Sequence, residues 1–227
     1  MGVLKGYDNI TKAAGHVPAL SSKEAVDAFQ ILVFDLINEA YKTIKTPTPF
    51  TEMPSEPLIS VSLYDALKII VDRDSIPCSF SPELPEFTKD IREGRKPANT
   101  AKKYDLVFEN WNSDARVEFG VEAKLLVEND IQKRVANALI REYVSDAGMG
   151  KYINKLYNKR GIMVGYIVEG ATSNIVVKIN QQIEDSLNKK EVLQIVTESK
   201  FKHSEIYKSE HLGKIDYSLY HLMLNFN

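Results

Sequence analysis

The chain has 227 residues, with 29 Lys and Arg against 31 Asp and Glu, and a net charge of −2. This length suits a single α/β domain with a proper core, although two small lobes also fit. The balanced charge argues against nonspecific coating of nucleic acid but leaves room for a local basic cleft. A lone cysteine, Cys78, excludes disulfides and multi-cysteine zinc sites.

No signal peptide is visible at the N-terminus, and no apolar run is long enough to span a bilayer. We therefore expect a cytoplasmic protein with no membrane contact. Residues 1–20 show no periodic pattern and are predicted to form an arm or loop. Apolar residues then recur at helical spacing from Ala25 to Ile44, which predicts a helix that starts at Ser21 or Ser22 and ends before Pro47.

Four prolines within residues 46–59 predict an extended connector. Ser60 or Ser62 can cap a second helix, whose apolar positions run to Val71. Further prolines up to Pro85 interrupt regular structure, which leaves one short helix around residues 87–92. Residues 1–100 are thus predicted to be mainly helix and loop.

Residues 103–127 contain two runs of alternating apolar and polar residues, joined by a turn-forming segment at 110–114. This pattern predicts an antiparallel hairpin. If the inward residues of both strands share a face, Asp105 lies opposite Glu122 or Gly120, and Asp105, Glu122 and Lys124 share a face. Cβ atoms are then about 4.5–5.5 Å apart in a direct pair and about 7–8 Å apart in a diagonal one.

Two carboxylates at such separations can share one Mg²⁺, whose remaining ligands are water and phosphate oxygens. Lys124 can orient or deprotonate an attacking water, or offset charge that grows on a phosphate. Asp105, Glu122 and Lys124 are therefore the predicted catalytic residues. A solvated sheet edge is the alternative, but the apolar residues 125–127 are unusual for an edge strand.

The arrangement resembles the PD-(D/E)XK superfamily of restriction-endonuclease-like nucleases. Asp105 matches its first acidic ligand, and Glu122-Ala123-Lys124 matches its (D/E)-X-K element, while Tyr104 stands where the motif's name has proline. The resemblance implies a mixed sheet flanked by helices and Mg²⁺-dependent cleavage of nucleic acid, with Mn²⁺ able to substitute. It also implies that the backbone carbonyl of Ala123 is a metal ligand.

In several nuclease families of this kind, a helix that precedes the hairpin supplies a further carboxylate, which either binds the metal directly or contacts one of its ligands. Asp35 and Glu39 lie one turn apart on the first predicted helix, and Glu39 is the candidate. The alternative is that Glu39 is a solvated residue of an amphipathic helix.

Basic residues lie on both sides of the hairpin in the sequence. Five of them come just before Asp105 and predict that the rim of the active site contacts phosphates. The alternative is that they belong to a solvent-exposed loop with no such contacts. A helix predicted over residues 128–146 and the glycine-bracketed turn after it add polar and basic groups. The predicted nucleic-acid contacts are Arg92, Arg95, Lys96, Lys102, Lys103, Gln132, Arg134 and Lys151.

The C-terminal half predicts a central strand at residues 162–168, a crossover helix at 175–188 and a further strand at 191–197. An edge hairpin is predicted over residues 203–226. The fold class is therefore α/β, with a mixed sheet flanked by helices. Residues 1–227 form one restriction-endonuclease-like domain in this interpretation, with a mainly helical N-terminal part and a nuclease core at 101–227.

The predicted function is that of a Mg²⁺-dependent endodeoxyribonuclease, of the kind found in restriction or antiviral defence systems. Double-strand cutting usually needs two active sites, so a homodimer is the default, and a partner subunit in a defence complex is also open. Two alternatives remain: a catalytically inactive subunit with the same fold that binds nucleic acid or a partner, and an RNase.

Overall fold

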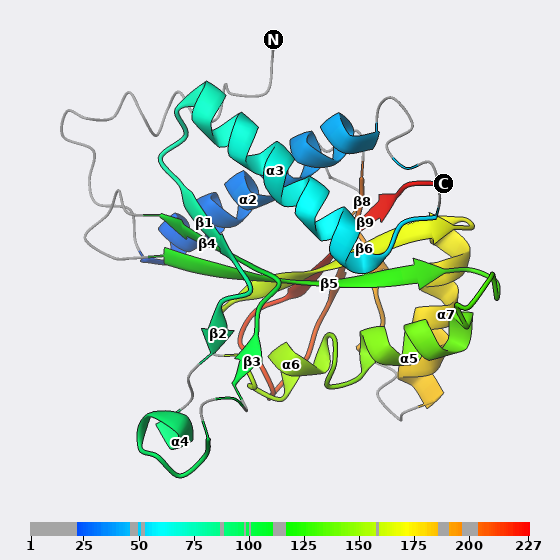
Figure 1. Cartoon of the computed structure of the whole chain (residues 1–227). Helices are drawn as coiled ribbons and strands as arrows, with labels where there is room; N and C mark the ends of the chain where they lie inside the picture. The colour runs from blue at the N-terminus through cyan, green and yellow to red at the C-terminus, as the bar shows by residue number, and fades with distance from the viewer. Residues whose placement is uncertain are drawn as a thin grey trace.

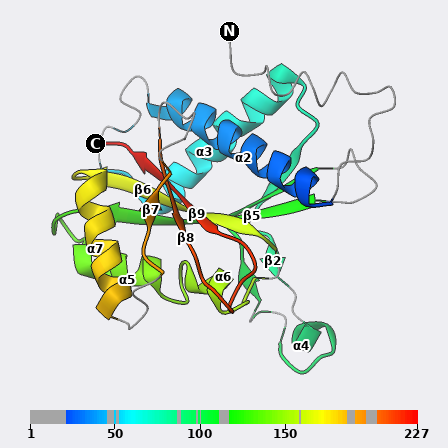
Figure 2. The ribbon, with the colours of Figure 1, turned by 180° about the vertical axis from the view of Figure 1, so that it is seen from behind.

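The computed structural model describes residues 22–45, 50, 53–86, 89–97, 99, 101–110, 117–157, 159–185, 191–196 and 204–227. The arm or loop predicted at residues 1–20 lies outside these ranges, as does most of the turn predicted at 110–114. The described part is α/β, with a mixed seven-stranded sheet and helices on both of its faces (Figures 1 and 2). The predicted fold class is confirmed at this level.

Neighbouring strands of the sheet are parallel on both sides of β6 and antiparallel elsewhere. In spatial order the strands are β1 (Ser79–Pro82), β4 (Leu106–Asn110), β5 (Val117–Val127), β6 (Gly161–Glu169), β9 (Leu219–Asn225), β8 (Glu205–Ser209) and β7 (Gln194–Ile195). A separate two-stranded ribbon pairs β2 (Pro85–Glu86) with β3 (Lys102–Lys103).

Helices α2 (Ser22–Lys45) and α3 (Glu56–Asp74) cover one face of the sheet. The opposite face carries α5 (Ala136–Val144), α6 (Gly150–Ile153) and α7 (Thr172–Asp185), as Figures 1 and 2 show. The short helix α4 (Lys89–Arg92) stands away from both layers, beyond the β2–β3 ribbon. None of the described helices is both long and apolar enough to cross a membrane.

The hairpin of β4 and β5 has one of the two predicted registers. Leu106 pairs with Val121, so Asp105, which immediately precedes β4, lies beside Glu122. Alternate residues of β5 point to opposite faces. Val121, Ala123 and Leu125 pack in the core beneath α2 and α3, whereas Leu126 belongs to the second core, beneath α5 and α7. Glu122 and Lys124 therefore face the layer of α5 and α6.

The start of α3 differs from the prediction, because the helix begins at Glu56 and not near Ser60 or Ser62. Ser55 is the N-cap, and its hydroxyl accepts a hydrogen bond from the N–H of Leu58. Pro57 lies in the first turn of α3 and not in an extended connector. Proline lacks an N–H and is tolerated there, because that N–H has no intrahelical partner.

Prolines also misled the prediction for residues 77–86, where β1 and β2 form. Pro82 pairs with Leu106 at the edge of the main sheet, and Pro85 pairs with Lys103 in the ribbon. Both positions are compatible with proline because an edge strand needs no ladder hydrogen bond on its outer side.

The helix predicted over residues 128–146 is shorter than expected, since α5 begins at Ala136. Gln132 has a φ of +53°, a left-handed conformation that interrupts a helix. The carboxylate of Asp130 accepts a hydrogen bond from the N–H of Ala136 at 2.8 Å, and so caps the first turn from six residues away.

The C-terminal hairpin is not at the edge of the sheet, contrary to the prediction. β9 lies between β6 and β8, parallel to β6, and β7 follows β8 at the edge. Residues 221–224 of β9 are all buried, which is the burial pattern of an interior strand covered on both faces. After β6 and α7, the chain therefore forms β7 and β8 before it reaches β9, the strand that pairs in parallel with β6.

A buried chain of hydrogen bonds fastens β8 and β9 to α5. The hydroxyl of Tyr143 lies 2.8 Å from Nδ1 of His221, whose Nε2 lies 2.9 Å from the hydroxyl of Ser209. Ser209 is also 2.8 Å from Nε2 of His211, and Nδ1 of His211 lies 3.0 Å from Glu191. If each group donates its single proton to the next, the three links from Tyr143 through His221 and Ser209 to His211 are satisfied with both histidines neutral.

Acid should break this chain and remove its contribution to the stability of the protein. Burial lowers the pKa of His221 to about 3, from about 6.5 when unfolded, and nearby His211 adds to the effect. The unfolded state therefore binds one more proton between these values, so stability falls as pH drops below about 6.5. We expect His221 alone to cost about 2 kcal/mol at pH 5, measured by urea unfolding at pH 7.5 and 5.0. A His221→Gln variant should lose less on acidification, and an equal loss would contradict this origin.

Candidate active site

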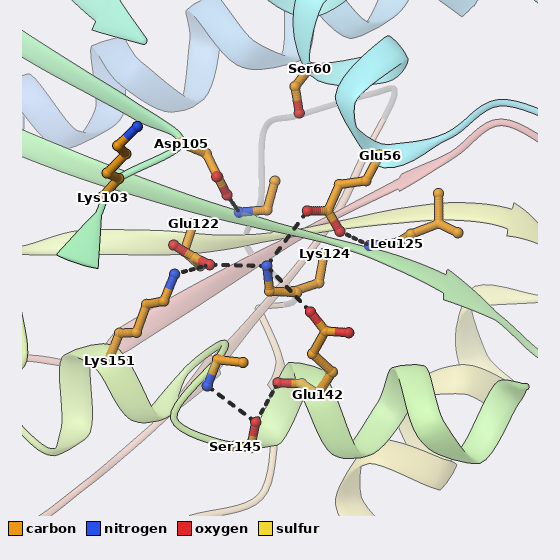
Figure 3. A network of polar contacts seen from close by, with 12 residues as sticks. Glu56, Ser60, Lys103, Asp105, Glu122, Lys124, Leu125, Glu142, Ser145 and Lys151 are labelled. Atoms are coloured by element: carbon orange, nitrogen blue, oxygen red, sulfur yellow. Dashed lines mark hydrogen bonds and ion pairs between the residues drawn. The ribbon is translucent and has the colours of Figure 1, made fainter. Parts of the chain in front are cut away.

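Two carboxylates occupy the edge of β5 at the point where β4 stops pairing with it. Oδ2 of Asp105 accepts a hydrogen bond from the N–H of Ala123 at 2.6 Å. Oε2 of Glu56, from the first turn of α3, accepts one from the N–H of Leu125 at 2.9 Å (Figure 3). The N–H and C=O of a residue in an antiparallel strand point to the same side, so the carbonyl of Ala123 points toward Asp105.

Glu122 is fully buried, and both of its oxygens are occupied. Oε1 lies 2.6 Å from Nζ of Lys151 and 3.1 Å from Nζ of Lys124. Oε2 accepts a hydrogen bond from the hydroxyl of Tyr157 at 2.8 Å. Figure 3 shows Lys124 at the centre of this group, with Glu56 reaching it at 3.5 Å and Glu142 of α5 at 3.8 Å. The site thus joins β5 to three helices.

A cluster of tyrosine rings holds Tyr157 against Glu122. The ring of Tyr104 stacks on that of Tyr157, with centroids 3.7 Å apart, and Tyr152 meets Tyr157 edge-on at 5.2 Å. A side chain at Gly120 would put its Cβ 2.5 Å from the ring of Tyr104, so this strand position requires glycine. Tyr104, which stands in the proline position of the motif's name, therefore fills the space above Gly120.

The charges at the site do not balance. Four carboxylates (Glu56, Asp105, Glu122 and Glu142) surround two ammonium groups (Lys124 and Lys151). Burial, followed by the charge of Glu122, raises the pKa of Asp105 to about 6. Burial alone would lower the pKa of Lys124, but the charges of Glu122, Glu56 and Asp105 outweigh it and raise that pKa. Lys124 is therefore an ammonium at neutral pH, whereas the pKa of Glu56, like that of Asp105, is raised, chiefly by burial.

The structure brings together five of the predicted site residues: Asp105, Glu122, Ala123, Lys124 and Lys151. It does not bring Glu39 to them. On α2 the carboxylate of Glu39 faces Lys42 of the same helix at 3.9 Å. The carboxylate that a preceding helix supplies is that of Glu56, which was not among the predicted residues. An acid directly after a potential N-cap, Ser55, was the available signal, but it does not indicate what the side chain would contact.

Five of the predicted nucleic-acid contacts lie on one protruding segment, the arm, which we define as residues 85–103. The arm carries β2, α4 and β3, and holds six Lys and Arg against three Asp and Glu in a chain with a net charge of −2. Within it, Arg95 lies 2.6 Å from Asp90 and also pairs with Glu93, while Lys96 lies 3.6 Å from Asp90. The arm ends two residues before Asp105.

The remaining predicted contacts are divided between the protein interior and its surface. Arg134 donates a hydrogen bond to the carbonyl of Pro54 at 2.7 Å, so it holds the segment that leads into α3 and Glu56. Gln132 is exposed in the turn before α5. Lys151 contacts Glu122, as described above.

The donor set fits a hard divalent cation in its chemistry. Asp105, Glu122 and Glu56 offer carboxylate oxygens, and Ala123 offers a carbonyl, which are the ligand types that Mg²⁺ prefers. Among the described residues, no three His, Cys, Asp or Glu side chains form a ready cage for a metal ion. Mg²⁺ usually binds one or two carboxylates together with waters and substrate phosphates, so it does not need such a cage.

Comparisons of the chain with protein-family models, with curated proteins and with solved structures each returned no match.

An Asp105→Asn variant should be more stable than the wild type at pH 7.5 in the presence of a chelator. Asparagine keeps an acceptor for the N–H of Ala123 and removes a charge that burial and Glu122 disfavour. A carboxyl whose pKa is raised from 3.8 to about 6 on folding opposes folding increasingly between these two pH values and fully above about 6, by an amount we put at about 1–3 kcal/mol. The gain, measured by urea unfolding, should shrink at pH 5, where wild-type Asp105 is protonated. A gain that grows at pH 5 would contradict this account.

Proposed function

We propose that this chain is a Mg²⁺-dependent endonuclease that hydrolyses DNA, with a restriction-endonuclease-like core. The observation that carries the proposal is that Asp105, Glu122 and the Lys124 ammonium converge at one end of the β4–β5 hairpin. Two oxygen ligands beside one fixed cationic group are what metal-assisted phosphodiester hydrolysis requires. The order of these residues also matches the motif of the superfamily that the sequence resembles.

The residues have distinct roles in this proposal. Asp105, Glu122 and the carbonyl of Ala123 would hold the cation, and Glu56 would be a further carboxylate beside it. A divalent cation bound there would supply Lewis-acid activation of water and of the scissile phosphate. Lys124 stabilises negative charge that develops on the phosphate, since its raised pKa makes it an ammonium and a poor base. Glu56 and Glu142 keep that ammonium in place.

Purified protein should cleave plasmid DNA with Mg²⁺ or Mn²⁺ and should not cleave it with a chelator. Asp105→Ala and Lys124→Ala should each lower the rate about 10²- to 10³-fold, the effect of removing one preorganised electrostatic contact. Rates are measured on supercoiled plasmid, linear duplex, single-stranded DNA and RNA. Equal cleavage by the wild type and both folded variants would refute the assignment.

Two glutamates make matched controls for this experiment. Glu56 contacts Lys124 and the backbone of β5, whereas Glu39 contacts Lys42 of its own helix. We expect Glu56→Gln to reduce cleavage and Glu39→Gln to leave it at the wild-type rate. The opposite pattern would restore Glu39 as the additional carboxylate of the site.

Lysines of the arm should contact the phosphate backbone of the DNA substrate. The side chains of Lys103 and Lys96 are 59% and 62% exposed, so phosphates can reach them, and Lys103 is two residues from Asp105. A Lys102→Gln/Lys103→Gln variant should bind DNA more weakly, and its slope of log affinity against log salt should become shallower by about 1 for each lysine that pairs with a phosphate. Fluorescence anisotropy in a chelator measures binding without cleavage. Lys42→Gln, which removes a 54% exposed lysine from α2, should leave the slope unchanged.

One observation favours the inactive-subunit alternative, namely that Glu122 is completely buried with both oxygens occupied. Such a subunit would bind nucleic acid or a partner without Mg²⁺. The nuclease, the RNase and the inactive subunit are distinguished by measuring binding in a chelator and cleavage of both DNA and RNA. DNA cleavage supports the nuclease, RNA cleavage alone supports an RNase, and metal-independent binding without cleavage supports the inactive subunit.

A further inference from the structure

A single oxygen of Glu122 is in contact with two ammonium groups. Oε1 lies 2.6 Å from Lys151 and 3.1 Å from Lys124 (Figure 3). A divalent cation that bound this oxygen would have two positive charges as near neighbours. Coulomb repulsion at such distances is strong even at the effective dielectric constant of a protein surface, so at least one of the two lysines must move away.

The two lysines are held with unequal strength. Lys124 lies near three carboxylates, those of Glu122, Glu56 and Glu142, and two of them remain if Glu122 turns to another cation. Among the described residues, Lys151 forms a direct ion pair with one carboxylate, that of Glu122, and its charge also acts on Asp105 from farther away; its ammonium lies 5.3 Å from the ring centre of Tyr157. Lys151 therefore has less to hold it in place than Lys124.

The backbone that carries Lys151 is fixed, so any movement belongs to the side chain. The N–H of Lys151 donates to the carbonyl of Gly148, and its own carbonyl accepts from the N–H of Tyr157 at 2.9 Å. Preceding it, a Cβ on Gly150 would lie 2.6 Å from the carboxylate of Asp146 and 2.8 Å from the carbonyl of Ser145, which shows how tight the turn is. The lysine stem, with four rotatable methylenes, can reorient without moving α6.

We propose that Lys151 is an internal counter-ion that neutralises Glu122 in the metal-free protein and that the incoming divalent cation displaces. This inference rests on the proposed function, because it assumes that Glu122 is a metal ligand. Because the backbone of Lys151 stays in place, the displaced ammonium remains close to the site and can contact an anionic oxygen of the substrate. The same residue thus protects the buried carboxylate before metal binding and supplies a positive charge afterwards.

Calorimetric titration with Mn²⁺ in the absence of nucleic acid tests the proposal. Lys151→Met removes the competing charge and should bind Mn²⁺ about tenfold more tightly than the wild type, a ratio equivalent to about 1.4 kcal/mol. Lys159→Met is the matched control. Its side chain is 17% exposed against 13% for Lys151, but it pairs with Glu86 and Glu118 instead of Glu122. This control should bind Mn²⁺ with an affinity within about twofold of the wild type, a difference of less than about 0.5 kcal/mol.

Unchanged or weaker Mn²⁺ affinity in Lys151→Met would overturn the proposal, as would an equal gain in Lys159→Met. If Lys151→Met does not unfold cooperatively, and so is not properly folded, Lys151→Gln is measured in its place. This variant keeps a hydrogen-bond donor for Glu122 and should show the same gain in Mn²⁺ affinity. The plasmid assay is scored separately. If the wild type cleaves DNA but Lys151→Met shows no gain in Mn²⁺ affinity, the nuclease proposal stands and the counter-ion proposal is rejected. If Lys151→Met binds Mn²⁺ tenfold more tightly but the wild type cleaves no DNA, the counter-ion proposal stands and the nuclease proposal is rejected.

Discussion

The burial of the Glu122 carboxylate is the constraint around which this structure is arranged. Removing an ion from water costs several kcal/mol unless hydrogen bonds and opposite charges replace the lost hydration. Here the replacements come from different parts of the chain: Lys124 from β5, Lys151 from α6 and Tyr157 from the turn that follows. The packing of α6 against the sheet is thereby linked to the chemistry of the hairpin.

A second constraint is that β4 is shorter than β5 and begins only at Leu106. Because β4 pairs with β5 only as far as Val121, the next outward N–H groups of β5 need other acceptors. Carboxylates from Asp105 and Glu56 take these positions. Two acids are thus fixed by backbone groups and not by flexible side chains. This arrangement explains how negative charge can accumulate beside Glu122 without local unfolding.

The hairpin was predictable, and its register could be narrowed to two alternatives, because both depend on local alternation of apolar and polar residues. The grouping of Asp105, Glu122 and Lys124 followed directly from that register. Glu56, in contrast, is 66 residues from Glu122 in the sequence, and its role depends on how α3 packs over β5, which no local pattern encodes. The prolines failed as boundary signals for a related reason, since Pro57 and Pro82 occupy the few helix and strand positions that accept proline.

The interior position of β9 has a consequence for how the sheet is completed during folding. β6 is flanked by β5 on one side and by β9 on the other, although nearly fifty residues separate the end of β6 from the start of β9. During synthesis, one whole edge of β6 therefore stays unpaired until residues 219–225 have left the ribosome. A strand as apolar as β6 with an open edge is a template for intermolecular pairing. The nascent chain is thus exposed to aggregation until β9 docks.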